Sequence, residues 1–210
     1  MDLYFSPLAC SLATRIALYE ANLEGETAFH NVTLSTRRTE DGRDYWKITA
    51  KGQVPALITR EGELLTEGPA VLQYVADQAP KTGLAPSADT FDRYRVQQWL
   101  NFISTELHKQ IFAVAFNPGA PAEAKNYALS TVLPQKFDFL ERHLSDGRAY
   151  LTGDTFTVAD AYLLTVLNWP RSAGVDLARW KSIQAYHERM LTRPQVARAV
   201  AEEMKLAGRA

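Results

Sequence analysis

The single cysteine of this chain lies between a short apolar run and an amphipathic helical pattern. Cys10 follows residues 3–5, "LYF", and a Ser-Pro turn, and it directly precedes the helical pattern. A thiolate at a helix N-terminus is stabilised by free backbone N–H groups and the helix dipole, so this thiol is a candidate nucleophile. A lone free cysteine is also often a small buried apolar residue. Ala13 stands where a Cys-x-x-Cys pair would have its second thiol, so any redox cycle needs a thiol from another molecule.

A second candidate site is the segment 51–57, "KGQVPAL". A proline that opens a strand removes one ladder donor, and a Val-Pro bond can be cis. The backbone groups of Val54 would then face away from their own sheet and could pair with an extended peptide, as in β-augmentation. A simple strand start accounts for the same pattern.

Glu67 and Gly68 stand at the N-terminus of a predicted helix, in "LLTEGPAVLQYVAD". Backbone N–H groups at such an end bind a carboxylate, while the glutamate side chain can take an ammonium. A ligand with both groups on one carbon, an α-amino acid end, would fit. As an acidic residue matched to the helix dipole, Glu67 needs no ligand at all.

A polar face is predicted on the helix that contains "WLNFISTELHK", residues 99–109. At about 100° per residue, Asn101, Thr105 and His108 lie within roughly 60° of one another, beside a separate apolar stripe. A solvated helix face is the alternative to a binding site. Further along, Thr157 and Asp160 match the helix-start pattern of a capping box, which we assign to folding and stability.

The elements that must position these residues form an α/β region followed by an all-helical region. Apolar residues at i, i+4, i+7 and i+11 from Leu12 predict a helix that ends near residues 22–25. Strands are predicted at 3–5, 29–34, 54–59 and 63–66, and a second helix at 68–79, which together give the order βαβ followed by ββα. Residues 35–44 are expected to form a loop.

We place a linker at residues 81–90, between a first domain at 1–80 and an all-helical domain at 91–210. Long helical patterns cover 91–116, 122–144, 158–169, 177–193 and 196–206.

Composition limits the class of protein. The 210 residues are 46% hydrophobic and 22% charged, as in ordinary globular proteins. A net charge of -1 argues against nucleic-acid binding, which requires clustered Lys and Arg. The N-terminus lacks the pattern of a secretory signal, and no apolar run approaches the roughly 20 residues that span a membrane. We expect a cytoplasmic protein without membrane or nucleic-acid partners.

In their order along the chain, these motifs resemble the cytosolic glutathione transferases, and most closely the bacterial beta class. The resemblance rests on "LYFSPLACSLATRIAL", "GQVPAL", "LLTEGPAVLQYVAD", "WLNFISTELHK" and "FTVADAYLLTVL", so it covers both predicted domains. Other classes of the family place a tyrosine or serine at the working position near the N-terminus.

The resemblance implies a thioredoxin-like N-terminal domain, a helical C-terminal domain, a homodimer, and glutathione as cosubstrate, with no separate cofactor and no metal. Cys10 would sit against the glutathione sulfur, with Ser11 as a further donor to it. The cysteinyl part of glutathione would pair with Val54 before a cis Pro55. Glu67 and Gly68 would hold the γ-glutamyl end.

Other residues complete the implied site. Asn101, Thr105 and His108 would come from the helical domain, with His108 near the sulfur. Arg37 stands where the family has a lysine that meets the glycine carboxylate; an arginine keeps the charge but can bind bidentately.

The expected activity is conjugation of reduced glutathione to hydrophobic electrophiles, for which Phe112, Phe116 and Trp169 are candidate pocket residues. Core packing is the alternative role for at least one of them. A second expected branch is glutathione-dependent thiol-disulfide exchange through Cys10. Rival hypotheses are a non-catalytic module of this fold that binds a protein partner, and a glutathione-dependent isomerase.

Overall fold

A computed structural model describes residues 1–208 of the chain. These residues form two compact units. The first contains residues 1–85 together with the segment from Pro194, and the second contains residues 86–193. The division falls inside the linker that we placed at 81–90. The last helix groups with the first unit, whereas the sequence analysis placed it in the helical domain at 91–210.

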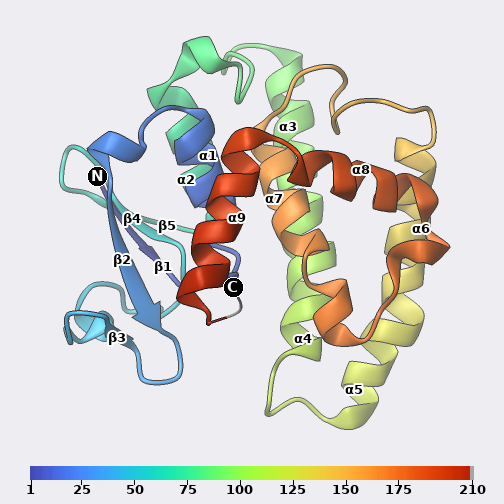
Figure 1. Cartoon of the computed structure of the whole chain (residues 1–210), viewed down its shortest axis with the longest axis horizontal. Helices are drawn as coiled ribbons and strands as arrows, with labels where there is room; N and C mark the ends of the chain where they lie inside the picture. Colours follow the sequence, from blue (N-terminus) through green and yellow to red (C-terminus); the bar gives the residue numbers. More distant parts are fainter. Residues whose placement is uncertain (209–210) are drawn as a thin grey trace. The chain divides into compact units, whose positions relative to one another are not determined.

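Within the described residues, the first unit has a five-stranded mixed sheet in the order β3-β2-β1-β4-β5. The strands are β1 (Asp2–Phe5), β2 (Ala28–Thr33), β3 (Arg38–Thr39), β4 (Ala56–Ile58) and β5 (Leu64–Thr66). The central strand β1 runs parallel to β2 and antiparallel to β4, and β4 is antiparallel to β5. Helices α1 (Leu12–Glu20), α2 (Gly68–Gln78) and α9 (Pro194–Leu206) belong to the same unit (Figure 1).

Burial accounts for the elements that the sequence predicted in this unit. Leu3, Tyr4 and Phe5 of β1 are all buried, as expected for a central strand covered on both faces. Every residue of α1 from Leu12 to Tyr19 is buried. Strand β4 begins at Ala56 and not at residue 54 as predicted, because Pro55 has no N–H to donate, and it ends one residue early, at Ile58.

The expectation of a loop throughout residues 35–44 is wrong at β3. Arg37 has φ 54°, and its N–H donates to the Thr33 carbonyl at 2.8 Å, which closes a tight turn after β2. The chain then returns antiparallel to β2, with Val32 opposite Thr39. A two-residue strand of polar residues has no hydrophobic alternation by which to recognise it.

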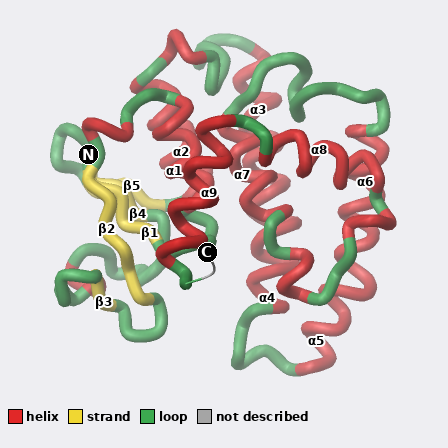
Figure 2. Tube along the Cα trace, viewed as in Figure 1, coloured by secondary structure: helices red, strands yellow, loops and turns green. Residues whose placement is uncertain are grey.

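The second unit is built of helices, which Figure 2 shows in red. Its α-helices are α3 (Phe91–Phe102), α4 (Ala113–Ala115), α5 (Ala122–Tyr127), α6 (Leu133–Leu144), α7 (Val158–Leu167) and α8 (Lys181–Leu191). Two π-helical stretches interrupt the predicted long helices, η4 (Ile103–Phe112) and η5 (Ala128–Val132). Short 3-10 helices are η1 (Glu24–Glu26), η2 (Tyr45–Lys47) and η3 (Pro80–Thr82) in the first unit and η6 (Pro170–Ala173) and η7 (Leu177–Arg179) in the second. Together, the sheet-containing first unit and the helical second unit confirm the predicted α/β plus all-α class.

The predicted capping box opens α7, whose residues are all buried. The Thr157 N–H and the Thr157 hydroxyl both donate to Asp160 Oδ2 at 2.8 Å. The other carboxylate oxygen accepts the Leu151 N–H at 2.8 Å and the Tyr186 hydroxyl at 2.7 Å. Asp160 therefore joins the start of α7 to a preceding loop and to α8.

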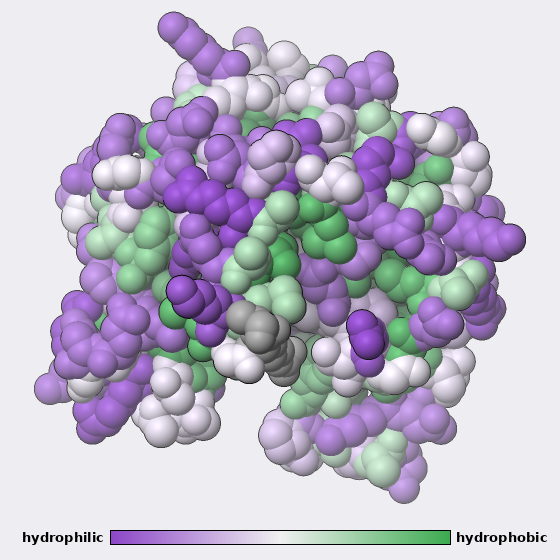
Figure 3. All heavy atoms as spheres, viewed as in Figure 1, coloured by the Kyte–Doolittle hydropathy of each residue, from purple (hydrophilic) through white to green (hydrophobic). Residues whose placement is uncertain are grey.

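The surface is mainly polar. Hydrophilic side chains predominate on the face shown in Figure 3, and hydrophobic ones form smaller patches between them. The most exposed large apolar side chains are those of Phe91, Tyr127 and Tyr94, at 72%, 61% and 60%. No helix within residues 1–208 has both the length and the apolar character needed to cross a membrane.

Candidate functional site

The structure brings Cys10 and Val54 together in the first unit. The Cys10 thiol donates to the Val54 carbonyl at a sulfur to oxygen distance of 3.1 Å. Cys10 is partly exposed and lies two residues before α1, so it is at the helix N-terminus that the sequence predicted. A nucleophile and a backbone edge that could bind a peptide are therefore adjacent.

Ser11 closes the loop that carries Cys10. Its fully buried hydroxyl accepts the Ser6 N–H at 3.1 Å and donates to the Ser6 carbonyl at 3.2 Å. A bond from this hydroxyl to a glutathione sulfur would have to replace the bond to Ser6. The geometry therefore supports a role in shaping the loop, while the predicted donation to sulfur stays a prediction.

A buried ion pair lies beneath the same loop. The Leu8 N–H donates to Glu203 Oε2 of α9 at 2.7 Å, and Arg15 Nε donates to Glu203 Oε1 at 3.0 Å. The Arg15 guanidinium carbon lies 4.2 Å from the ring centre of Phe5 and 4.4 Å from that of Phe29. Burial raises the pKa of Glu203 to about 7, against the opposing effect of Arg15. The last helix of the chain thus holds the backbone two residues before Cys10.

Sequence reasoning missed this ion pair. Arg15 and Glu203 are 188 residues apart, so no local pattern connects them. A charged residue within an amphipathic helix is the signal that could have indicated it. A charge that becomes buried requires a partner of opposite charge, and each of these two helices contains such a residue.

The loop before β4 is fixed by a buried tyrosine. Tyr45 is fully buried, and its hydroxyl donates to the Gln53 carbonyl at 2.9 Å. Burial raises the pKa of Tyr45 above its usual value. The peptide bond between Val54 and Pro55 is cis. No hydrogen bond from the Val54 N–H to any of residues 1–208 is present, and Val54 itself is 8% exposed.

Glu67 lies at the start of α2, as predicted, with an unusual backbone. Its φ is 71°, a left-handed conformation that is costly for a residue with a side chain and that occurs often at functional sites. The helix begins at Gly68, followed by Pro69. The Glu67 side chain is 62% exposed and forms an ion pair with Lys51, whose Nζ lies 2.5 Å from Oε1.

Arg37 presents a cation on the turn between β2 and β3. Its guanidinium carbon lies 5.8 Å from the ring centre of Trp46, which is 53% exposed. The Arg37 Nε atom is buried and has no hydrogen-bond partner in the described chain, and no carboxylate of residues 1–208 forms an ion pair with this side chain. An anion that reached this turn would satisfy the charge of this side chain.

In the second unit, His108 is held by Tyr162. Its Nδ1 atom lies 2.7 Å from the Tyr162 hydroxyl. Burial, with a smaller contribution from Lys109, lowers the pKa of His108 to about 4, so the ring is neutral near pH 7. In the tautomer in which the tyrosine donates to Nδ1, the ring proton is on Nε2 and that nitrogen is a donor; in the other tautomer Nδ1 donates to the tyrosine oxygen and Nε2 is an acceptor.

The three predicted pocket aromatics lie together near His108. Ring centres are 5.7 Å apart for Phe112 and Trp169, 6.0 Å for Phe112 and Phe116, and 6.4 Å for Phe116 and Trp169. His108 is 5.0 Å from Trp169 on the same measure. Phe112 is fully buried and serves the core, whereas Phe116 is 45% exposed. This cluster leaves Phe116 as the aromatic that a substrate can reach most easily.

Asn101 and Thr105 differ from His108 in their exposure to solvent. Both side chains are exposed, and the Thr105 hydroxyl donates to the Asn101 carbonyl at 3.0 Å within the helix. The angular spacing that we predicted assumed an α-helix, but Thr105 and His108 lie in the π-helix η4, where the turn is wider. Their assignment to a ligand therefore stays a prediction.

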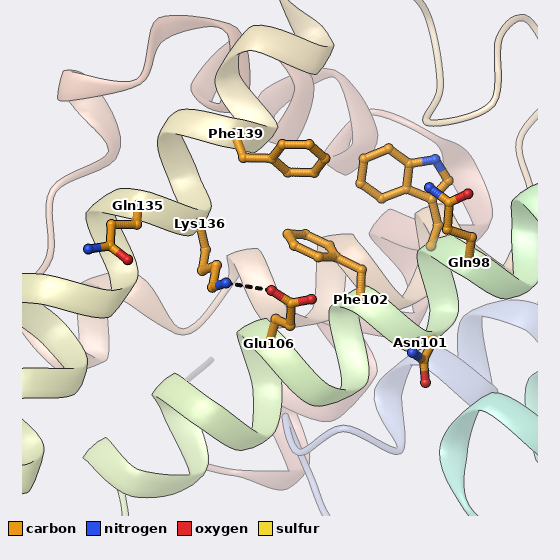
Figure 4. Close-up of a pocket in the computed structure, with 8 residues that line it drawn as sticks. Gln98, Asn101, Phe102, Glu106, Gln135, Lys136 and Phe139 are labelled. Atoms are coloured by element: carbon orange, nitrogen blue, oxygen red, sulfur yellow. Dashed lines mark ion pairs between the residues drawn. The ribbon is translucent and has the colours of Figure 1, made fainter.

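Asn101 also lines a pocket that sequence reasoning missed (Figure 4). The cavity, of about 430 Å³, lies between α3, η4 and α6, with Trp99, Phe102 and Phe139 as its aromatic residues. At its rim Lys136 forms an ion pair with Glu106 at 2.5 Å. None of the three predicted pocket aromatics lines it.

Within residues 1–208, no group of three or more His, Cys, Asp or Glu side chains is arranged to hold a metal.

Comparisons with known proteins agree with the resemblance seen in the sequence. The family model described as the glutathione S-transferase N-terminal domain matches residues 2–77, and the model for the C-terminal domain matches residues 105–203. A relative from Escherichia coli O157:H7, glutathione S-transferase GstA, is 40% identical over 203 residues, which are 97% of this chain and 98% of that protein.

Solved structures give the same answer. A beta-class glutathione S-transferase of Sphingomonas chungbukensis has a TM-score of 0.91 and 40% identity, covering 97% of this chain and 98% of that one. A sphingomonad glutathione S-transferase in complex with glutathione has a TM-score of 0.90 and 41% identity, with the same coverage. This chain therefore belongs to the glutathione S-transferase family, and it is similar to the bacterial beta class.

Proposed function

We propose that this chain conjugates reduced glutathione to hydrophobic electrophiles and holds the glutathione sulfur beside Cys10. The observation that carries the proposal is the contact of the Cys10 thiol with the Val54 carbonyl, next to a Val54 N–H that has no partner among residues 1–208. An extended peptide on Val54 would pair through its backbone and bring its own cysteine to Cys10. The sphingomonad relative, whose structure contains glutathione, supports the same ligand.

The charged ends of glutathione match the groups on either side of Val54. Glu67 and the N–H groups at the start of α2 would take the γ-glutamyl ammonium and carboxylate. Arg37, with its unpartnered Nε, would take the glycine carboxylate. Asn101, Thr105 and His108 remain assigned to glutathione by resemblance.

Conjugation needs the glutathione thiolate and a positioned electrophile. The enzyme's contribution is to raise the thiolate population and to align the sulfur with the electrophilic carbon. A neutral His108 with its proton on Nε2 is suited to donate a hydrogen bond to a thiolate. Phe116 and Trp169 would provide the apolar surface for the electrophile.

A second activity, glutathione-dependent thiol-disulfide exchange, is favoured by the partial exposure of Cys10. The Cys10 thiolate attacks the glutathionyl sulfur of a mixed disulfide between glutathione and a substrate thiol, the disulfide bond breaks, and the substrate thiolate leaves with the electron pair. A free glutathione thiolate then attacks the glutathionyl sulfur bound to Cys10 and releases the Cys10 thiolate, so two glutathione molecules end as glutathione disulfide and the substrate disulfide is reduced to a thiol. Ala13 makes the external thiol necessary.

Binding and turnover test the proposal. S-methylglutathione should bind the purified protein in a calorimetric titration, and an aryl halide should be conjugated to glutathione at a rate proportional to enzyme. Replacement of Arg37 by methionine should weaken binding, while replacement of the exposed Arg38 should not. A folded protein that neither binds S-methylglutathione nor conjugates aryl halides would contradict the proposal and favour the non-catalytic module.

The proposal extends to a homodimer in the cytoplasm. The family resemblance implies the dimer, and a single free cysteine is typical of reducing compartments. Light scattering on the eluting protein should give twice the chain mass of 23.5 kDa. A monomer at micromolar concentration would contradict this part alone.

A further inference from the structure

The motif at residues 51–57 begins with a lysine that the proposed glutathione site leaves unused. The Lys51 ammonium lies 2.5 Å from Glu67 Oε1 and donates to the Thr66 hydroxyl at 3.1 Å. Glu67 is the carboxylate that the proposed function assigns to the γ-glutamyl ammonium. An ammonium of the protein itself therefore occupies one oxygen of the carboxylate that the ligand's ammonium would use.

Both partners of this ion pair are attached to constrained backbone. Lys51 precedes Gly52, which has φ 56° and where an added Cβ would lie 2.6 Å from the Trp46 ring. Glu67 has φ 71°. The backbone beside Lys51 and at Glu67 therefore has few alternative conformations, which fixes the points from which the two side chains extend.

We propose that Lys51 is an internal substitute for the γ-glutamyl ammonium on Glu67, so that glutathione binds by exchanging one ammonium for another. This inference rests on the proposed function and adds a specificity-determining residue to it. Lys51 competes only with ligands that carry an amino group at the γ-glutamyl end. A ligand without this group leaves the pair of Lys51 and Glu67 intact.

Because glutathione must displace Lys51, its own ammonium contributes less to its binding free energy than it would without Lys51. Lys51 is 51% exposed and Glu67 is 62% exposed, so the pair is of the solvent-screened kind. Ion pairs of this kind contribute enough to change an equilibrium by a factor of about 1.4 to 5. Removal of Lys51 should therefore increase the discrimination in favour of the amino group by about this factor.

A thermodynamic cycle tests the competition. Dissociation constants are measured by calorimetry for S-methylglutathione and for its counterpart that lacks the α-amino group, with the natural protein and with Lys51→Met. The quantity of interest is the ratio of the two constants, deaminated ligand over S-methylglutathione. The effect of a lost positive charge on the carboxylates is common to both ligands and cancels in this ratio.

We expect Lys51→Met to raise the ratio by a factor of about 1.4 to 5. The matched control is Lys47→Met, which removes an exposed lysine from η2 and should leave the ratio unchanged. Glu67→Gln should bring the ratio close to one with or without Lys51. Because the pair is exposed, all three variants should melt at nearly the natural temperature.

The outcomes separate the two proposals. If Lys51→Met leaves the ratio unchanged or lowers it while S-methylglutathione still binds, the exchange is refuted and the proposed function stands. If no variant and not even the natural protein binds S-methylglutathione, the proposed function fails, and the exchange, which depends on it, fails with it.

Discussion

Replacement of Arg15 by methionine should destabilise the chain in a pH-dependent manner. Arg15 is 5% exposed at its side chain and Glu203 is 0% exposed, so the variant leaves a buried carboxylate without its charged partner. Removal of one partner of a buried ion pair costs about 3 to 5 kcal/mol. Methionine keeps much of the packing against Phe5 and Phe29 and makes favourable contacts with aromatic rings. We therefore expect a loss of about 3 kcal/mol where Glu203 is ionised.

The direction of the pH dependence follows from Glu203. Its pKa is raised from 4.5 to about 7 in the folded chain, so the folded state binds a proton that the unfolded state releases. Stability linked to this group is fully present below pH 4.5 and is lost as pH rises through 7, by about 3 kcal/mol in all. Without Arg15 the pKa rises further, so the loss continues above pH 7. Arg15→Met should therefore lower the free energy of unfolding most in alkaline buffer.

The assay is urea unfolding followed by far-ultraviolet circular dichroism at about pH 5.5 and about pH 8.5. The cost of Arg15→Met should be about 3 kcal/mol at the higher pH and about 1 kcal/mol at the lower, where Glu203 is protonated. Adding Glu203→Gln removes the buried charge and keeps an acceptor for the Leu8 N–H, so the double variant should recover stability at high pH. A cost that is equal at both pH values, or no recovery, would refute the reasoning.

Three further variants test other parts of the structure. Thr157→Ala should lower the free energy of unfolding by about 1 kcal/mol in the same urea assay, and a Thr157→Ser variant that lost as much would contradict the capping role. His108→Gln should lower kcat for conjugation and flatten acid unfolding, because His108 is neutral in the fold and stability linked to it is lost as pH falls from 6.5 towards 4; unchanged kinetics would remove it from the site. Tyr45→Phe leaves the Gln53 carbonyl without its donor, so the Kd for S-methylglutathione should rise severalfold with little change in kcat, and an unchanged Kd would exclude positioning through this bond.

Local patterns predicted much of the first unit. The apolar face through Leu12, Ile16 and Tyr19 located α1, and Gly68 located the start of α2, because periodicity and helix-start chemistry act over a few residues. The polar strand β3 has neither signal. Nor does the sequence show that α9 packs against α1, since these helices lie at opposite ends of the chain.

The sequence predicted which residues form the candidate site, but not the residues that hold them in place. The sequence assigned Cys10 and Val54 separately to glutathione, and the structure places them in contact, while Phe112, Phe116 and Trp169 form one cluster. The residues that hold the site residues in place are distant from them in the sequence or lie in loops without a recognisable motif. Tyr162, which contacts His108, is an example of a distant residue. Their roles follow from three-dimensional contact, which residue spacing does not encode.

The central claim is that a glutathione site surrounds Cys10, and the kinetics of its modification test this most directly. The protein is incubated with increasing glutathione disulfide, and the fraction carrying one glutathionyl group is followed by intact mass. The account predicts a rate that saturates with concentration and that S-methylglutathione suppresses, with no adduct in Cys10→Ala. A rate that rises linearly without saturation, and that S-methylglutathione leaves unchanged, would show that Cys10 is merely an accessible thiol and would contradict the claim.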